Sequence, residues 1–303
     1  MALVNTKKML KEALEKGYAI PAFNICNMES AQAVAEVASE KNAPVIISVS
    51  EGAGKYAGFD YIKAIVEVAA SKSSNDIALH LDHGKTFEVC KAAIDAGFTS
   101  VMIDASALAY EENIAETKKV VDYAHARNVT VEAELGKIMG TEDLISSTTE
   151  RFTDPDEAKD FVSRTGVDSL AISIGTAHGV NKSIKTPIIQ YGVIESVHKA
   201  IPEIPLVAHG SSTVPAKWVE LIIKYGGEIK KSQGIAEQDI VKMSKSAICK
   251  INMDTDLRLA HTAGVREDLA LNPNHFDQRD YNKAGKKYVK EQIAHAIELV
   301  EGI

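Results

Sequence analysis

Residues 77–104 read IALHLDHGKTFEVCKAAIDAGFTSVMID and show the pattern on which the whole chain is built. The runs Ile77–Asp82 and Thr99–Asp104 are short, apolar and rich in β-forming residues, as buried strands are. Between them, Glu88–Ala96 has helical patterning, and the following Gly97 is the residue type that commonly closes a helix. The stretch therefore predicts a strand, a helix and a second strand in succession.

The same alternation continues along the chain. Further runs with strand character are Tyr18–Asn24, Pro44–Ser50, Val129–Leu135, Ser169–Gly175, Ile204–His209 and Ala247–Asn252. Helical patterning recurs in Asn113–Ala126, Pro155–Thr165, Gln190–Ala200 and Lys217–Tyr225. Eight alternations in 303 residues predict an α/β fold, a (β/α)8 TIM barrel forming a single domain over 1–303, with a C-terminal helical extension at about 259–303. The alternative is a doubly wound open sheet, which would more naturally carry a glycine-rich loop after its first strand, where residues 24–27 read Asn-Ile-Cys-Asn.

Composition narrows the range of partners. The net charge of −8 argues against nucleic acid, although a few local cations and backbone amides suffice to hold a small anion. No apolar run is long enough to span a membrane, and the N-terminus lacks an apolar signal core. The three cysteines are widely spaced and form no CxxC pair, which is typical of reduced thiols. We therefore expect a cytoplasmic protein with no membrane partner.

Polar side chains stand at the ends of nearly all the apolar runs. They are Asn24, Ser50, Asp82 with His83, Asp104, Glu134, His178, His209, and Asn252 with Asp254. In TIM barrels the chemistry lies at the carboxyl ends of the strands. These groups are therefore expected to meet at one rim and form an active site.

Three histidines among these groups predict a metal site. His83, His178 and His209 are each followed directly by glycine, which tolerates close backbone approach or positive φ. Three converging imidazoles leave coordination positions open for substrate and suit Zn²⁺, with Co²⁺, Mn²⁺ or Fe²⁺ as possible replacements. His80 lies inside a predicted strand, and we interpret it as a buried, hydrogen-bonded histidine or a partner that supports a ligand.

The acidic residues are less specific. Glu132 and Glu134 lie two residues apart and so on one face of a strand. Glu132 is expected to pair with Lys or Arg from a neighbouring strand, whereas Glu134, nearer the rim, is placed to contact the metal or a second metal position. Glu142 follows in a glycine-containing loop, where a solvated acid is the ordinary outcome.

Loops after the later strands predict a phosphorylated substrate. Gly179, Lys182, and Gly210 with Ser211 and Ser212 offer the backbone amides, hydroxyls and cation that bind phosphate in this fold. Arg258 is a candidate to clamp another anionic group. An ion pair with Asp254 or Asp256 at the start of a helix explains Arg258 equally well.

Seven motifs together resemble the class II, metal-dependent ketose-bisphosphate aldolases, especially the fructose-1,6-bisphosphate aldolases. They are YAIPAFN (18–24), HLDHG (80–84), GFTSVMIDAS (97–106), VEAELG (131–136), IGTAHG (174–179), PLVAHGSS (205–212) and KINMDTDLR (250–258). They run in family order from about Leu10 to the C-terminal helix. This sequence differs from the family pattern at Ala177 and at Ala208. It also differs in the segment 144–153, which is shorter here than in many members of the family.

The resemblance implies roles for the metal and proton-transfer residues. It makes the three strand-end histidines the zinc ligands: His83, His178 and His209. Glu134 matches a residue that contacts a displaced or second metal position. Asp82 matches the acid/base on the C4 hydroxyl, and Glu142 the mobile-loop acid that moves the proton beside the carbonyl.

It also implies the substrate contacts. One phosphate would lie on Gly179, Lys182, Gly210 and Ser212, where a monovalent cation, Na⁺ or K⁺, often helps. Ser50 and Arg258 match the other phosphate site, with the arginine typically reaching across a dimer interface. The remaining substrate contacts are assigned to Asn24, Asn252, Asp254 and Thr255. A homodimer or homotetramer is expected.

The implied reaction is reversible cleavage of D-fructose 1,6-bisphosphate to dihydroxyacetone phosphate and D-glyceraldehyde 3-phosphate, with zinc stabilising the enediolate. The alternative is tagatose-1,6-bisphosphate aldolase. Such sister enzymes tend to carry Ala-Thr-Glu-Leu-Lys where residues 254–258 read Asp-Thr-Asp-Leu-Arg, which favours the fructose substrate. A zinc hydrolase would commonly show His-x-His on an early strand, and residues 80–83 lack that spacing. A catalytically dead sugar-phosphate sensor would be expected to lose Asp82 or a ligand histidine, and both are kept.

Overall fold

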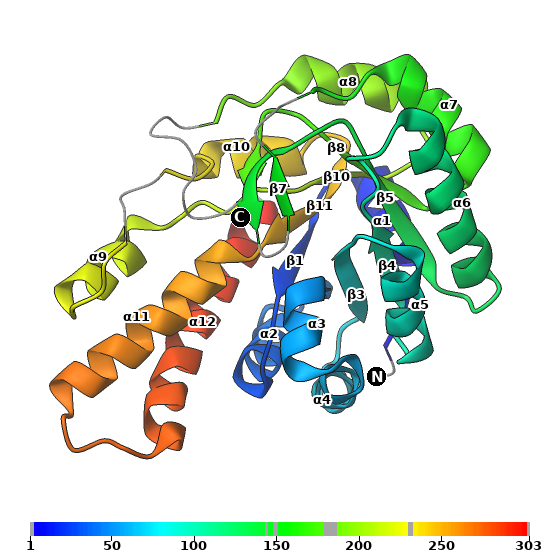
Figure 1. Cartoon of the computed structure of the whole chain (residues 1–303). Helices are drawn as coiled ribbons and strands as arrows, with labels where there is room; N and C mark the ends of the chain where they lie inside the picture. Colours follow the sequence, from blue (N-terminus) through cyan, green and yellow to red (C-terminus); the bar gives the residue numbers. More distant parts are fainter. Residues whose placement is uncertain (1–2, 143–144, 148–150, 179–186, 230–232, 302–303) are drawn as a thin grey trace.

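The computed structural model describes residues 3–142, 145–147, 151–178, 187–229 and 233–301. For residues 139, 141–142, 145–147 and 178 the description covers the backbone alone. The central element is a closed barrel of parallel strands (Figure 1), which confirms the predicted fold class. The barrel strands are β1 (Ile20–Asn24), β2 (Val45–Ser50), β3 (Ile77–Gly84), β4 (Ser100–Ile103), β5 (Thr130–Leu135), β8 (Ser169–Ile172), β10 (Leu206–Ala208) and β11 (Ile248–Met253).

Each barrel strand lies inside one of the eight predicted apolar runs or extends it by a residue or two at the rim. Neighbours in sequence are neighbours in the barrel, and β1 closes the ring on β11 with Ala22 opposite Asn252. The described residues of these strands are all buried, because the helices cover the outer face and side chains fill the interior.

Twelve helices are described. They are α1 (Thr6–Lys16), α2 (Met28–Lys41), α3 (Glu51–Ala57), α4 (Phe59–Ser71), α5 (Phe87–Asp95), α6 (Tyr110–His125), α7 (Pro155–Thr165), α8 (Tyr191–Ala200), α9 (Ala216–Lys224), α10 (Glu237–Ser244), α11 (Thr255–Leu271) and α12 (Gln278–Glu301). Local chemistry sets several boundaries. The Asp154 side chain accepts from the first backbone amides of α7, Pro155 occupies the first turn, and Gly166 ends the helix with φ 74°.

Helix α1 closes one end of the barrel. Met9, Leu10 and Ala13 pack against Ile20 and Ala78 among the inward-facing residues of the strands. The backbone of Val4 donates to Ile77 O at the start of β3, so α1 lies at the amino ends of the strands. A substrate therefore has to enter at the opposite, carboxyl end.

The last two helices, α11 and α12, run antiparallel and extend beyond the barrel (Figure 1). Helix α12 packs back on α2, and the ion pair between Lys286 and Glu36 (2.6 Å) joins the two. The two helices occupy the residues of the predicted C-terminal extension. That these residues form a unit separate from the barrel stays a prediction. Across the described residues, no helix is both long and apolar enough to cross a membrane.

A small second sheet, which was not predicted, stands beside the barrel. It joins β6 (Met139–Glu142), β7 (Ile145–Ser147) and β9 (Ala177–His178). Two expectations need correction. Glu142 lies in a strand rather than a loop, and His178 lies in β9, beyond the end of β8 at Ile172. The reason is a backbone ladder between Gly140 and His178, which side-chain patterning does not reveal.

Candidate active site

The carboxyl end of β3 presents two adjacent side chains to the same site. In a regular strand, successive side chains point to opposite faces. His83 instead has φ 51°, a left-handed conformation that is uncommon outside glycine, and this breaks the alternation. His83 Nε2 consequently lies 4.0 Å from Asp82 Oδ1. Gly84 is required for a different reason, since a Cβ there would fall 2.9 Å from Met102 O on β4.

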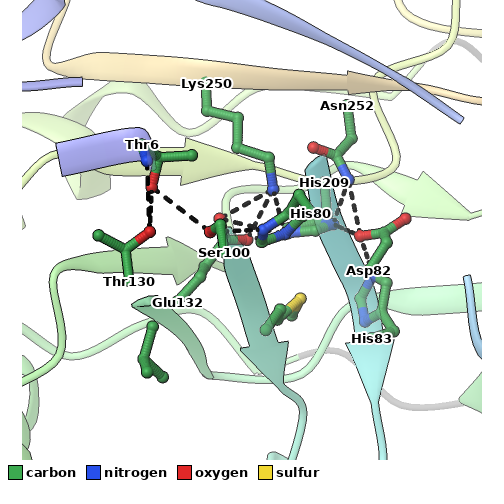
Figure 2. Close-up of polar contacts among 12 residues, drawn as sticks. Thr6, His80, Asp82, His83, Ser100, Thr130, Glu132, His209, Lys250 and Asn252 are labelled. Atoms are coloured by element: carbon green, nitrogen blue, oxygen red, sulfur yellow. Dashed lines mark hydrogen bonds and ion pairs between the residues drawn. The ribbon is translucent and has the colours of Figure 1, made fainter. Parts of the chain in front are cut away.

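The Asp82 carboxylate is held by two asparagines. Asn24 Nδ2 donates to Asp82 Oδ2 at 2.7 Å. Asn252 Nδ2 donates to Asp82 Oδ1 at 2.9 Å (Figure 2). Since a carboxylate only accepts, both amide NH₂ groups have to face it. The Oδ1 atoms of Asn24 and Asn252 are buried and accept no hydrogen bond from the described residues. They are therefore available to substrate hydroxyls.

His209 follows β10 and lies against His83. The two ring centroids are 4.4 Å apart in an edge-on arrangement. His209 Nδ1 lies 3.2 Å from Asn252 Nδ2 and 3.8 Å from Asp82 Oδ1, whereas Nε2 lies 2.7 Å from Glu132 Oε1. Thus Nδ1 faces the rim, and Nε2 faces the barrel interior.

On the other side of His83 lies a pair of acids. His83 Nδ1 lies 3.1 Å from Asp104 Oδ2. Ser106 Oγ lies between the two acids, 2.7 Å from Asp104 Oδ1 and 3.2 Å from Glu134 Oε1. Glu134 Oε2 is buried, with no hydrogen bond from the described residues. Asp104 was noted in the sequence as a strand-end group but was not assigned to the metal, because strand position alone gives no distance to His83.

The pKa values of this cluster reflect an excess of buried negative charge. Burial and the neighbouring Asp104 raise the pKa of Glu134 to about 8. Burial opposes protonation of His83, but Asp82 and the hydrogen bond with Asp104 prevail and raise its pKa to about 10. Burial alone would raise the pKa of Asp104, yet the contacts with His83 and Ser106 leave it below its ordinary value. The cluster therefore favours a positive charge at its centre.

These residues fit a divalent cation. Ligand atoms of Asp82, His83 and His209 lie within 4.8 Å of one another, as do those of the second set, His83, Asp104 and Glu134. Imidazole nitrogen and carboxylate oxygen suit zinc and related ions. A cation would also satisfy the buried Glu134 Oε2.

His178 is described by its backbone alone, yet its strand lies close to His209. An ideal Cβ built on Gly210 would fall 2.7 Å from the carbonyl carbon of Ala177, so the residue before His178 touches the residue after His209. Gly210 also has φ 61°. Both the close approach of Ala177 and the positive φ therefore favour glycine at this position. The structure brings the chain at His178 beside the rim.

A cavity of about 410 Å³ opens next to the asparagine pair, lined by residues that include Asn24, Ser50, Asp254 and Arg258. Arg258 forms a two-point ion pair with Asp254, through Nε to Oδ1 (2.7 Å) and an η nitrogen to Oδ2 (2.6 Å). The alternative interpretation of Arg258 as an ion-pair partner is thus what the structure shows. Ser50 Oγ accepts from Ala53 N and begins α3.

The remaining predicted substrate residues divide into two groups. Ser212 and Thr255 are buried near the carboxyl ends of β10 and β11. Gly179 and Lys182 lie outside the described residues. Glu142 is described only by its backbone, in β6.

A closed parallel barrel with buried histidines and carboxylates gathered at the carboxyl ends of its strands defines a metal-dependent TIM-barrel enzyme. A sequence model described as "Fructose-bisphosphate aldolase class-II" matches residues 4–302. The chain therefore belongs to the class II fructose-bisphosphate aldolase family, which confirms the resemblance. It is a lyase that reversibly cleaves fructose 1,6-bisphosphate, and its family implies a divalent metal.

Individual relatives agree over nearly the full length. The chain is 42% identical to a fructose-bisphosphate aldolase of Treponema pallidum, covering 100% of this chain and 97% of that one. It is 45% identical to that of Thermus caldophilus, covering 98% and 97%. Among solved structures it is similar to the YdjI aldolase of Escherichia coli K12, with a TM-score of 0.80, 33% identity, and coverage of 98% and 97%.

Proposed function

We propose that the rim residues cleave D-fructose 1,6-bisphosphate to dihydroxyacetone phosphate and D-glyceraldehyde 3-phosphate with zinc as the divalent ion. The observation that carries this proposal is the Asp82 carboxylate, held by Asn24 and Asn252 beside the rings of His83 and His209. A general base has to lie within hydrogen-bond reach of the proton it removes, and two amides fix Asp82 in one orientation.

Asp82 is proposed as the acid/base for the C4 hydroxyl. Cleavage of the C3–C4 bond turns C4 into an aldehyde, so its hydroxyl proton has to leave. Asp82 accepts that proton and returns it in the condensation direction. The free amide oxygens of Asn24 and Asn252 are suited to hold the hydroxyls next to the reacting bond.

The electron pair left on C3 needs a stabilising group. When bound, a divalent cation supplies this as a Lewis acid that withdraws charge through the carbonyl oxygen. We propose His83, His178 and His209 as its ligands and Glu134 at a second metal position. Glu142 is proposed to carry the proton at C3, and the pairing of β6 with β9 supports this by bringing that strand next to His178.

For the phosphates we propose two sites. Gly179, Lys182, Gly210 and Ser212 would hold one, with Na⁺ or K⁺ as an auxiliary cation. Ser50 and Arg258 would hold the other, a role supported by their place in the 410 Å³ cavity. Arg258 would then have to exchange part of its ion pair with Asp254 for the phosphate. Asp254 and Thr255 complete the proposed substrate contacts beside Asn252.

The relatives and residue 254 favour the fructose epimer over the tagatose epimer as the substrate. Asp254 stands where sister enzymes acting on the tagatose epimer tend to carry alanine. The Treponema and Thermus relatives are both named fructose-bisphosphate aldolases. A higher kcat/KM on tagatose 1,6-bisphosphate than on fructose 1,6-bisphosphate would reverse this choice.

The main test combines metal exchange with one conservative variant. Activity should disappear after chelation and return with Zn²⁺ or Co²⁺, and Asp82→Asn should lower kcat roughly 10²- to 10⁴-fold while zinc stays bound. Cleavage that is insensitive to EDTA would contradict the metal role. An Asp82→Asn enzyme with unchanged kcat would contradict the proton-transfer role.

Assembly and location remain predictions. A homodimer or homotetramer is proposed. A cytoplasmic location is also proposed, and it is supported by the three cysteines, which are all in the thiol form. Sedimentation equilibrium of the purified chain tests the assembly, and a monomer at all concentrations would rule it out.

A further inference from the structure

A chain of buried polar side chains crosses the barrel interior beneath the proposed metal site (Figure 2). It begins at Thr130, passes through Thr6 on α1, and continues to the metal-site histidine, His209, by way of Ser100, His80, Lys250 and Glu132. None of these side chains is more than 3% exposed. Since buried polar groups are costly unless hydrogen-bonded, the arrangement of protons along the chain is constrained.

Lys250 sets the direction of hydrogen bonding. Its ammonium group has three hydrogens and can only donate. All three have acceptors: Glu132 Oε1 at 3.0 Å, Glu132 Oε2 at 2.8 Å and His80 Nε2 at 3.1 Å. His80 must therefore accept at Nε2 and carry its hydrogen on Nδ1, which lies 2.8 Å from Ser100 Oγ.

The same reasoning determines the tautomer of His209. Glu132, ionised beside the ammonium group, can only accept, so the contact of 2.7 Å requires a hydrogen on His209 Nε2. The lone pair then lies on Nδ1. The amide of Asn252 points its Nδ2 at this atom from 3.2 Å, as a donor would. Both sides of the imidazole thus require one tautomer.

We propose that Glu132 and Lys250 are positioning residues that hold His209 in the tautomer presenting Nδ1 to the divalent cation. This inference rests on the proposed function, because it takes His209 as a metal ligand. Carboxylates that orient metal-binding histidines in this way raise metal affinity 10- to 100-fold. Lys250 is needed because its two hydrogen bonds to Glu132 compensate the cost of burying that carboxylate beside His209.

A purely structural ion pair would stabilise the barrel without affecting the metal. Zinc affinity, measured by competition with a chelating dye, and the visible spectrum of the Co²⁺-loaded protein separate the two roles. In Glu132→Gln an NH₂ group, which only donates, replaces one carboxylate oxygen, so it has to face either Lys250 Nζ or His209 Nε2, where Glu132 now accepts. We expect zinc affinity to fall 10- to 100-fold and the Co²⁺ spectrum to change.

Two further variants calibrate the comparison. Thr130→Val removes a hydroxyl from the far end of the same chain, so it should lower Tm and leave zinc affinity unchanged. The charge-balanced double variant Glu132→Gln with Lys250→Met should show the same loss of affinity as Glu132→Gln. If Glu132→Gln fails to fold, the double variant takes its place in the comparison.

Failure of this inference is distinguishable from failure of the proposed function. If His209→Ala leaves zinc affinity unchanged, His209 is not a metal ligand, and both the proposed ligand set and this inference are wrong. His209→Ala with weakened affinity, together with a Glu132→Gln protein of normal affinity and spectrum, would overturn the positioning role alone. The unmodified protein gives an independent test: ¹⁵N spectra of metal-free, histidine-labelled enzyme should show His209 protonated on Nε2, and protonation on Nδ1 would overturn the proposal.

Discussion

Asn252 Nδ2 lies 2.9 Å from Asp82 Oδ1 and 3.2 Å from His209 Nδ1, so one amide connects the proposed acid/base to a proposed metal ligand. The contact is made across the barrel, because Asn252 comes from β11 and Asp82 from β3. Its counterpart, Asn24, approaches the other oxygen of Asp82 from β1. The Asp82 carboxylate is therefore oriented by residues from two further strands.

Asn252→Ala is expected to lower kcat by roughly 10²-fold, because Asp82 loses one of its two amide donors and its orientation. Asn252→Asp should be worse, since a second carboxylate would replace the amide donor and repel Asp82. Steady-state kinetics measures kcat of both variants, and elemental analysis checks that each still contains zinc. Wild-type kcat in both variants would show that Asp82 needs no orientation from β11.

Removing the metal is expected to lower Tm, because a bound cation then no longer compensates the cost of burying His83, Asp104 and Glu134 together. Binding to the folded state alone adds about 2.7 kcal/mol when free zinc is 100 times Kd. Calorimetry of the chelated and reloaded protein measures the difference, and Glu134→Gln should reduce it. Equal Tm values with and without zinc would argue against a metal at this cluster.

Gly84→Ala is expected to destabilise the fold by about 1–3 kcal/mol and to reduce zinc affinity, because the new methyl would meet Met102 O at 2.9 Å and displace His83. Gly192→Ala in α8 is the matched control, since a Cβ there meets nothing within 4 Å. Denaturant unfolding should show Gly192→Ala at least as stable as the parent. Similar losses in both variants would mean that the packing at Gly84 is not special.

Asp256→Asn is expected to loosen the loop after β10. Asp256 is buried and accepts from Thr213 N (2.8 Å), Thr213 Oγ1 (2.9 Å) and Val214 N (2.8 Å), while Val214 holds a positive φ of 52°. The variant should lose about 1–3 kcal/mol of stability. Because this loop contains Gly210 and Ser212, KM should rise more than kcat falls. An unchanged KM in a destabilised variant would limit Asp256 to a structural role.

Much of the molecule followed from sequence alone. The eight strands, α5 to α9 to within a few residues, and the position of polar groups at strand ends were predicted, because hydrophobic periodicity and turn residues are local properties of the chain. Pairing of Glu132 with a basic residue was also predicted, since a carboxylate inside a barrel requires a cation. The expected neighbouring strand was wrong, because Lys250 comes from β11 and reaches Glu132 on β5 through the barrel interior. The family resemblance was carried by short motifs whose order was visible in the sequence.

Other features were decided only by tertiary structure, because they depend on distances between segments far apart in the chain. Closure of the barrel brought Lys250 within hydrogen-bond distance of Glu132 and placed Asp104 beside His83. Backbone pairing outside the barrel, which has no side-chain signature, moved Glu142 and His178 into a second sheet. The left-handed turn at His83 likewise depended on close packing that local patterns do not encode. For Arg258 the sequence left two interpretations open, and the structure shows the local ion pair with Asp254.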